Sequence, residues 1–301
     1  MTIQEEIADL KVKKKAVILA HLYTNPEIQT VADYVGDSFY LSKLAATTDA
    51  EVLVFCGVLF MAESAKLLSP DKTVLMPSKT ADCPMAHMCD VETIAKVKAE
   101  NDDVAVVCYI NSTAELKAHA TVCVTSSNAF KVVNALPNKN IFFIPDKNLG
   151  HYLAKKMPNK HFIFNEGYCP THENLKDVAI EAVKSKHPQA KVLAHPECNE
   201  GVLNLSNFVG STSEIIQFVG EDSGKAYIIC TEKGILHPLK TQNPEKAFYF
   251  PQPEPICADM KSITLEKIAR VLKTGENSIQ MSDEQMTCSK LSLEKMLNLS
   301  K

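Results

Sequence analysis

The chain has 301 residues, of which 46% are hydrophobic and 23% are charged, and its formal net charge is -4. This composition is ordinary for a soluble globular protein, and no basic stripe with interleaved aromatic residues suggests a nucleic-acid partner. No apolar run reaches the roughly 18 residues of a membrane span, and residues 1–15 lack the apolar stretch of a signal peptide. The composition therefore predicts a cytoplasmic protein with neither nucleic acid nor membrane as a partner.

In chain order, a helical pattern at residues 4–13 precedes three similar units of strands and helices. Short apolar, β-branched runs closed by polar residues are typical of buried parallel strands. Such runs lie at 16–23, 51–58 and 73–77 in the first unit, at 103–111, 140–146 and 161–165 in the second, and at 190–197, 226–232 and 247–251 in the third. Helices are predicted at 28–37, 59–68, 113–120 and 149–157, with only a short turn near 235–240. Two more helical patterns, at 264–272 and 291–297, fall outside the units together with 4–13, and we expect all three to pack on the outside.

Four features recur at a nearly constant spacing, which indicates a tandem triplication with a period of about 87 residues. The prolines of a Pro-x-Lys turn are 88 and 86 residues apart, at Pro70, Pro158 and Pro244. The same two spacings separate the ends of the opening strands, at His21, Tyr109 and His195, and the next helix starts, at Ser38, Ser126 and Thr212. Spacings of 86 and 88 separate three cysteines, Cys83, Cys169 and Cys257.

The alternation of strands with segments of crossover length predicts an α/β fold of small parallel sheets covered on both faces. Because no low-complexity linker separates the units, we expect three pseudo-threefold-related α/β domains, each with three layers, around a central active site. The predicted repeats are residues 1–88, 89–175 and 176–259, and residues 260–301 are predicted to form C-terminal helices that pack back on them.

Ten cysteines is a high number for a reducing compartment, where disulfides are not expected. Four of them lie in or beside apolar strands and are predicted to be inert core residues: Cys56, Cys108, Cys123 and Cys230. Three others follow the last strand of each unit in a loop that bears proline or glycine: Cys83, Cys169 and Cys257. Ligands in α/β folds gather at the carboxyl ends of strands, so the repeat predicts that these three thiols converge on one axis.

Three converging thiolates fit a metal site with an open position. A [4Fe–4S] cluster held by only three cysteines keeps one iron free to bind substrate as a Lewis acid. A three-cysteine zinc site with a bound water is the other metal possibility, and three unrelated loop cysteines without metal are the third. Cys89 has no counterpart in the other units and is predicted to be structural, while Cys198 is expected near the pocket without being a ligand.

Polar pairs close the three opening strands: His21 with Tyr23, Tyr109 with Asn111, and His195 with Glu197. Alternate strand residues point to one side, so we expect all six to face the axis. Glu197 is the only carboxylate in the set and is the natural general acid or base.

Hydroxyl residues mark the starts of the three following helices, at Ser38, Ser126 and Thr212. One interpretation is helix capping, and Ser211 with Glu214 fits a capping box. The other is that three helix N-termini line one pocket, which favours a small anionic substrate.

The chain also resembles a known family, quinolinate synthase of NAD biosynthesis, in the motifs AHLYTNPEIQ, GDSF, CPMAHM, YINSTAELKA, VTSSNA, FNEGYCPTH, AHPEC, GSTSEI and CADMKSITLEKI. The resemblance runs from about residue 15 to about residue 275 and implies three α/β domains around a [4Fe–4S] cluster. It also implies that iminosuccinate condenses with dihydroxyacetone phosphate to give quinolinate, with loss of phosphate and water.

Carried over residue by residue, the resemblance implies that the cluster ligands are Cys83, Cys169 and Cys257. The substrate contacts that it implies are His21, Ser38, Tyr109, Ile110, Asn111, Ser126, His195, Pro196, Glu197 and Thr212. Tyr23 is implied to belong to the pocket, and the groups implied to move protons are Glu197, Tyr23, His21, His195 and Tyr109. Some family members carry a C-x-x-C run at the third ligand; here ADMKS follows Cys257, so no thiol–disulfide switch is expected there. An aspartate-oxidising enzyme is the implied source of iminosuccinate.

Two other functions stay open on the residues alone. One is a different open-iron hydro-lyase that acts on a small di- or tricarboxylate, and the other is a non-enzymatic iron–sulfur carrier or sensor. The polar strand ends and helix starts around the cysteines favour an enzyme, because a carrier does not need them.

Overall fold

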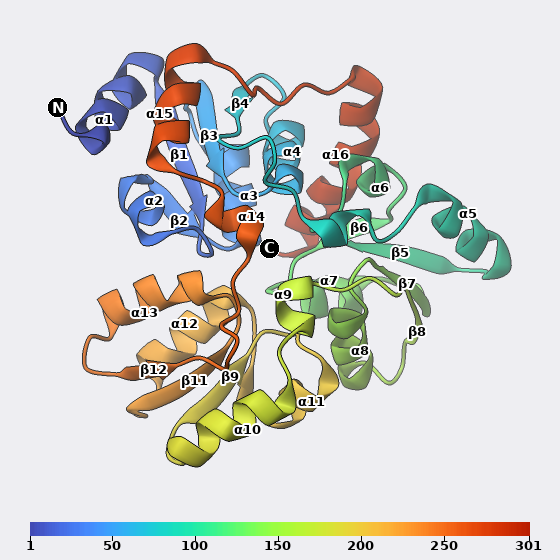
Figure 1. Cartoon of the computed structure of the whole chain (residues 1–301). Helices are drawn as coiled ribbons and strands as arrows, with labels where there is room; N and C mark the ends of the chain where they lie inside the picture. Colours follow the sequence, from blue (N-terminus) through green and yellow to red (C-terminus); the bar gives the residue numbers. More distant parts are fainter.

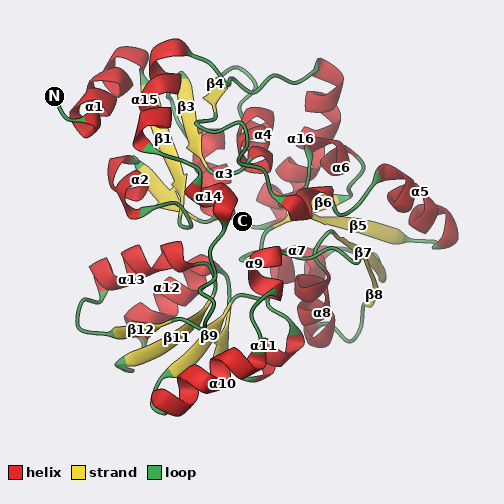
Figure 2. Cartoon of the chain, viewed as in Figure 1, coloured by secondary structure: helices red, strands yellow, loops and turns green.

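The computed structural model describes all residues from 1 to 301 and confirms the predicted α/β class. It contains three four-stranded sheets, and every neighbouring pair of strands in them is parallel. The three sheets form separate lobes around a common centre. Two short helices, α9 (Pro170–Glu173) of the second repeat and α14 (Ala258–Lys261) of the third, lie near that centre (Figure 1). Helices surround the strands of each lobe (Figure 2).

Each repeat builds its sheet in the same strand order. The first sheet has the order β2 (Tyr34–Gly36), β1 (Ala16–His21), β3 (Val52–Cys56) and β4 (Thr73–Leu75). The second has the order β6 (Val122–Val124), β5 (Val104–Tyr109), β7 (Asn140–Ile144) and β8 (His161–Phe164). The third has the order β10 (Phe208–Val209), β9 (Lys191–Ala194), β11 (Ala226–Cys230) and β12 (Ala247–Tyr249). The opening strand of every repeat therefore lies inside its sheet, with its carboxyl end directed to the same edge as those of its neighbours.

The crossover helices also recur. In the first repeat they are α2 (Pro26–Val31), α3 (Ser38–Thr47) and α4 (Leu59–Leu68), followed by the 3₁₀ turn η1 (Pro84–His87). In the second they are α5 (Val91–Glu100), α6 (Ala114–Ala118), α7 (Ala129–Ala135), α8 (Lys147–Lys156) and α9 (Pro170–Glu173). In the third they are α10 (Asp177–Lys186), α11 (Glu200–Asn204), α12 (Thr212–Glu221), η2 (Lys233–Ile235), α13 (Leu236–Gln242) and α14 (Ala258–Lys261). None of the helices is both long enough and apolar enough to cross a membrane.

Two details of the predicted elements are wrong. The helix predicted at 28–37 ends at Val31, and a second, short strand follows it in this repeat and at the matching place in the others. These strands have only two or three residues, too few for an alternating pattern to be recognised. In addition, the turn predicted near 235–240 is a helix, α13, which tolerates Pro238 because that residue lies in its first turn.

The helices at the chain ends also differ from the prediction. The starts of α1 (Ile3–Lys14), α5, α10 and α15 (Leu265–Thr274) are 88, 86 and 88 residues apart, so α1 and α15 follow the repeat rather than lie outside it. They pack together on the first sheet, where Ile7 and Ile268 are buried in one cluster with Ile18 and Val54. The last helix, α16 (Asp283–Leu299), is longer than predicted and packs on α6, α4 and β6.

The Pro-x-Lys turns have a shared structural role. Their lysines donate hydrogen bonds to carbonyls at the carboxyl ends of the helices that follow the second strands. Lys160 Nζ lies 2.5 Å from the Leu136 carbonyl after α7, and Lys246 Nζ lies 2.9 Å from that of Asp222 after α12. Lys72 contacts the Thr48 carbonyl after α3 in the same way. A cation at this end complements the helix dipole and satisfies carbonyls that the helix leaves unpaired.

Replacement of Lys246 by methionine tests this role. Lys246 is 6% exposed, and the variant leaves the Val219 and Asp222 carbonyls without their partner. We expect Lys246→Met to lower the free energy of unfolding by about 1–3 kcal/mol, as measured by urea denaturation. The exposed Lys225→Met is the control; an equal loss in both variants would contradict the proposed cap.

Candidate active site

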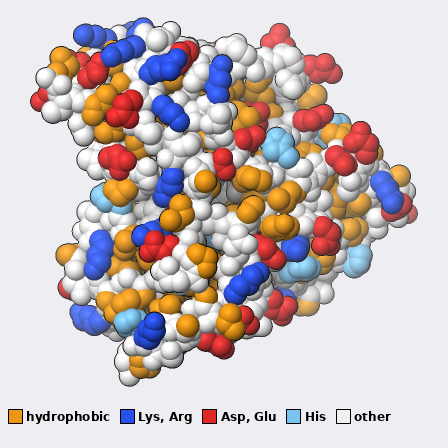
Figure 3. Space-filling view, in the orientation of Figure 1, with side chains coloured by type: hydrophobic (Ala, Val, Ile, Leu, Met, Phe, Trp, Pro, Cys, Tyr) orange, Lys and Arg blue, Asp and Glu red, His pale blue; other side chains and the backbone are white.

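A cavity of about 280 Å³ lies where the three repeats meet. The predicted residues that line it are His21, Tyr23, Ser38, Cys83, Tyr109, Asn111, Ser126, Cys169, His195, Glu197, Thr212 and Cys257. Ile110 and Pro196, which were also predicted as contacts, are buried but do not line it. Hydrophobic side chains gather near the middle of the face that Figure 3 shows. The repeat thus brings residues far apart in the sequence to one place.

The strand-end residues reach the cavity because parallel strands end at a common edge of each sheet. His21 is the last residue of β1 and Tyr109 the last of β5, while His195 follows β9 directly. Tyr23 extends from the first repeat to the third, where its hydroxyl lies 2.9 Å from Thr212 Oγ1 and 2.8 Å from Thr231 Oγ1. Side chains of different repeats are therefore joined across the cavity.

Each of the three loop cysteines stands immediately before a one-turn helix. Cys83 precedes η1, Cys169 precedes α9 and Cys257 precedes α14. Burial raises the pKa of the Cys83 thiol, and the neighbouring Cys257 raises it further. Burial also raises the pKa of Cys169, with contributions from Glu197 and Cys83, and that of Cys257 to about 11. Three crowded thiols with raised pKa values would ionise together only beside a strong positive charge, such as a metal centre.

Glu197 is the centre of a buried hydrogen-bond network. It is 3% exposed, and its Oε1 accepts a hydrogen bond of 2.6 Å from the Tyr109 hydroxyl. Its Oε2 lies 2.7 Å from His172 Nδ1 and 3.6 Å from His195 Nδ1. Burial alone would raise the pKa of Glu197, but the imidazoles and the Tyr109 hydrogen bond outweigh it and hold the pKa below its usual value. The carboxylate is therefore ionised.

Two imidazoles and two phenols near Glu197 are neutral. Burial lowers the pKa of His21 to about 3 and that of His195 to about 4. Burial, with the charge of Glu197, raises the pKa of the Tyr23 and Tyr109 hydroxyls. Around Glu197 the cavity thus combines an ionised carboxylate with the neutral imidazoles of His21 and His195 and with protonated phenols, a set able to accept and donate protons over short distances.

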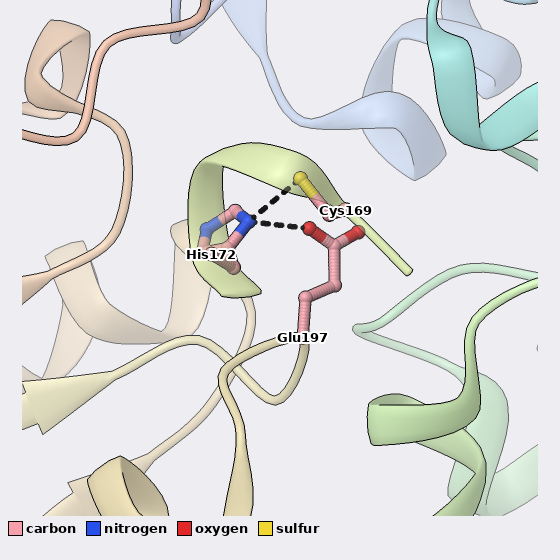
Figure 4. A group of neighbouring side chains, drawn as sticks. All are labelled: Cys169, His172 and Glu197. Carbon is pink, nitrogen blue, oxygen red and sulfur yellow. Dashed lines mark hydrogen bonds and ion pairs between the residues drawn. The ribbon is translucent and has the colours of Figure 1, made fainter. Parts of the chain in front are cut away.

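His172 is a site residue that the repeat analysis missed. Its Nδ1 lies 3.1 Å from Cys169 Sγ as well as close to Glu197 (Figure 4). Its Nε2 lies 2.8 Å from Thr231 Oγ1. The equivalent positions hold Ala86 and Met260, so no threefold pattern marks it. Its spacing from Cys169 was the available signal, because residues three apart lie on the same face of a helical turn.

The helix starts also differ from the capping interpretation. The caps of α3 and α12 are Asp37, which accepts from the Tyr40 N–H at 2.9 Å, and Ser211, which forms the expected capping box with Glu214. Ser38 and Thr212 are the first residues of these helices and line the cavity instead. Ser126 precedes α7 and has its hydroxyl 3.2 Å from His195 Nε2.

A second set of potential metal ligands overlaps the first. One ligand atom each of Cys169, His172 and Glu197 lie within 4.8 Å of one another. Figure 4 shows one ring nitrogen of His172 directed at both the Cys169 sulfur and a Glu197 oxygen. Hydrogen bonds join these three side chains to one another without an ion. The three cysteine thiols, in contrast, form no hydrogen bonds among themselves.

Comparisons with known proteins cover nearly the whole chain. A family model described as quinolinate synthetase A protein matches residues 5–298. The quinolinate synthase of Clostridioides difficile strain 630 is 50% identical over 296 residues, which are 98% of this chain and 96% of that protein. The quinolinate synthase of Caldicellulosiruptor bescii is 48% identical over 297 residues, 99% of this chain and 98% of that protein. A solved structure of a zinc-bound ZnuA deletion mutant aligns with a TM-score of only 0.20 at 14% identity, over 88% of this chain and all of that one, and carries no argument.

The low pKa of His21 predicts a pH dependence of stability. The unfolded chain binds a proton at this histidine below about pH 6.5, whereas the folded chain does so only near pH 3. Stability conferred by the neutral imidazole is therefore lost as the pH falls through this window, by up to about 1.4 kcal/mol per pH unit. His21→Asn, which keeps an acceptor for the Tyr23 N–H, should flatten the curve between pH 6 and pH 4.5.

Urea denaturation of the metal-free chain at several pH values measures the slope. The exposed His119→Asn is the matched control. A slope for His21→Asn that equals that of the control would contradict a neutral, buried His21.

Proposed function

The chain belongs to the quinolinate synthase family of NAD biosynthesis, and on this premise we propose that it condenses iminosuccinate with dihydroxyacetone phosphate in the central cavity. The products are quinolinate, phosphate and water. The observation that carries this chemistry is the convergence of three repeat-equivalent cysteines and the Glu197 network on one cavity. The alternatives, another hydro-lyase or an iron–sulfur carrier, are not favoured at 50% identity to a quinolinate synthase over 98% of the chain.

We propose that Cys83, Cys169 and Cys257 hold a [4Fe–4S] cluster. The donor set fits this group: all three thiols line the cavity, their pKa values are raised in the absence of a cation, and no fourth cysteine lines it. When bound, such a cluster supplies an iron without a protein ligand, which acts as a Lewis acid. A single ion held by Cys169, His172 and Glu197 is less favoured, because it would leave two of the three cysteines unused.

The cavity offers suitable partners for a small dianionic imine. The Asn111 Oδ1 atom is buried without a hydrogen-bond partner, and an N–H or O–H of the substrate would satisfy it. The N-termini of α3 and α12, with Ser38 and Thr212, provide backbone N–H groups and partial positive charge for carboxylate or phosphate. Neutral His21 and His195 add no charge of their own and serve as directional hydrogen-bond partners.

Proton transfer is assigned to the Glu197 network. Glu197 Oε1 and the Tyr109 hydroxyl form an acceptor–donor pair, and Oε2 with His172 Nδ1 forms a second one. A proton taken up at one oxygen can thus be released at a neighbouring group without crossing bulk water. Tyr23, His21 and His195 complete the set of groups that can supply protons during isomerisation and dehydration.

The reaction also implies a partner and a location. Iminosuccinate is an unstable imine, so we propose that an enzyme which oxidises aspartate supplies it. All ten cysteines are free, and free thiols with an iron–sulfur cluster fit the reducing cytoplasm.

The activity is tested with anaerobically purified protein, given oxaloacetate with ammonia as the source of iminosuccinate, and dihydroxyacetone phosphate. We expect quinolinate from the parent protein. Glu197→Gln should retain the cluster and lose about 100-fold or more in kcat, because the ionised acceptor is removed. No quinolinate from fully clustered protein would overturn the proposed reaction, and near-normal turnover by Glu197→Gln would remove this residue from catalysis.

Single cysteine replacements test the ligand set. Cys83→Ser, Cys169→Ser and Cys257→Ser should each abolish the cluster, because a hydroxyl is a poor ligand for cluster iron. The controls are Cys89→Ser, Cys198→Ser and Cys288→Ser, which should keep it. Iron and sulfide content and the electronic and paramagnetic spectra are the measurements; a full cluster in any of the first three variants would refute this assignment.

A further inference from the structure

The cysteine loops are tied to their sheets by a bond that all three repeats share. The first residue of the helix that follows the third strand donates its N–H to the carbonyl two positions before the cysteine. These bonds run from Leu59 to Ala81 at 2.9 Å, from Lys147 to Gly167 at 2.8 Å, and from Lys233 to Pro255 at 2.9 Å. At Gly167 the approach is so close that a Cβ atom would lie 2.5 Å from the Pro145 carbonyl oxygen. The loop position is therefore set by the sheet edge.

A second bond is present in only two repeats. Asp146 and Glu232, which follow β7 and β11, are both fully buried. Asp146 Oδ2 accepts the N–H of Cys169 at 3.1 Å, and Glu232 Oε1 accepts that of Cys257 at 3.2 Å. The equivalent position in the first repeat is Val58, 88 residues before Asp146, and it has no acceptor to offer.

In the first repeat the cysteine N–H has a different acceptor. The N–H of Cys83 donates to Asp82 Oδ1 at 2.8 Å, and Asp82 is a neighbour in the same loop. The Asp82 side chain is 36% exposed and also contacts His87 Nε2. This acceptor moves with the loop, whereas Asp146 and Glu232 belong to the sheet edges.

Helix capping alone does not explain a buried carboxylate at position 146. Asp146 Oδ1 caps α8 by accepting from the Leu149 N–H at 2.7 Å, a task that serine or asparagine performs elsewhere. Burial of a carboxylate is costly unless hydrogen bonds satisfy it, and the second oxygen is used for Cys169. Glu232 likewise divides its oxygens between Cys257, the Gly234 N–H and Lys261.

We propose that Asp146 and Glu232 are positioning residues that anchor the Cys169 and Cys257 backbones to the sheets and hold these two thiols ready for the iron–sulfur cluster. The inference rests on the proposed cluster. The Cys83 loop has the shared bond to its sheet but no such anchor, so it is the least constrained of the three loops before the cluster binds.

Asp146→Ser tests the anchor, because serine keeps the cap at the Leu149 N–H and removes the acceptor for Cys169. The matched control is Asp90→Ser, which makes the same change at the exposed cap of α5, where Asp90 accepts only from the Thr93 N–H. Each protein is reconstituted anaerobically with ferrous iron and sulfide, and iron release to a chelator is followed. We expect release from Asp146→Ser to be about 10-fold faster or more, with thermal unfolding of the cluster-free forms shifted no further than in the control. Glu232→Gln should act in the same direction.

Release rates equal to that of the parent in both Asp146→Ser and Glu232→Gln would overturn the inference and leave the proposed function intact. A parent chain that takes up no iron and sulfide would instead overturn the proposed cofactor, and the inference with it.

Hydrogen exchange of the cluster-free parent keeps the proposal testable if a variant does not fold. Amides in residues 167–171 and 255–259 should exchange more slowly than those in residues 81–85. Equal protection of the three loops would contradict the proposed difference.

Discussion

The parallel pairing of strands is the constraint on which the site depends. In each sheet the first, third and last strands run in the same direction, so the segments that follow them emerge at one edge. The cysteine loop can therefore bond to the start of the helix that follows the third strand, and the polar strand-end residues lie beside it. When three such edges meet, thiols, imidazoles and a carboxylate from distant segments come together. An antiparallel sheet of the same strands would place half of these groups on the opposite side.

The second organising factor is the low polarity of the centre. Burial keeps the thiols, the phenols and two of the imidazoles neutral, while the hydrogen bonds around Glu197 keep that carboxylate ionised. A cavity lined by three thiols and several carboxyl groups, with no lysine or arginine among its lining residues, is suited to a cationic centre. The N-termini of α3 and α12 bring partial positive charge to the same cavity, which favours anionic groups. The lysines of the Pro-x-Lys turns bind the carboxyl ends of α3 and α12, so the opposite ends of these helices, their N-termini, are the ones that face the cavity.

The sequence predicted those parts of the fold and site that repeat. The constant spacing identified the cysteine positions and the polar strand ends, because three copies of a pattern are easier to recognise than one. The spacing did not predict functional residues that occur in only one or two of the repeats. His172 has Ala86 and Met260 as its equivalents, and Asp146 and Glu232 have Val58, so symmetry gave no signal for them. Strands of two or three residues, such as Phe208–Val209, were also missed, since they form by pairing with a longer neighbour rather than by local preference. The domain boundaries and the roles of the site residues stay predictions.

Val58 has a further consequence for recognition. A cavity with true threefold symmetry would present three identical walls, and a small substrate could bind in three degenerate orientations. Here the first repeat contributes Val58, Phe60 and Met61 to the lining, while the third contributes Glu197 and Glu232. The first repeat thus adds apolar side chains that the other copies do not match, and the third repeat adds two carboxyl groups. The divergence of the copies thus removes the degeneracy that triplication created, and it would give the proposed dicarboxylate substrate a single orientation.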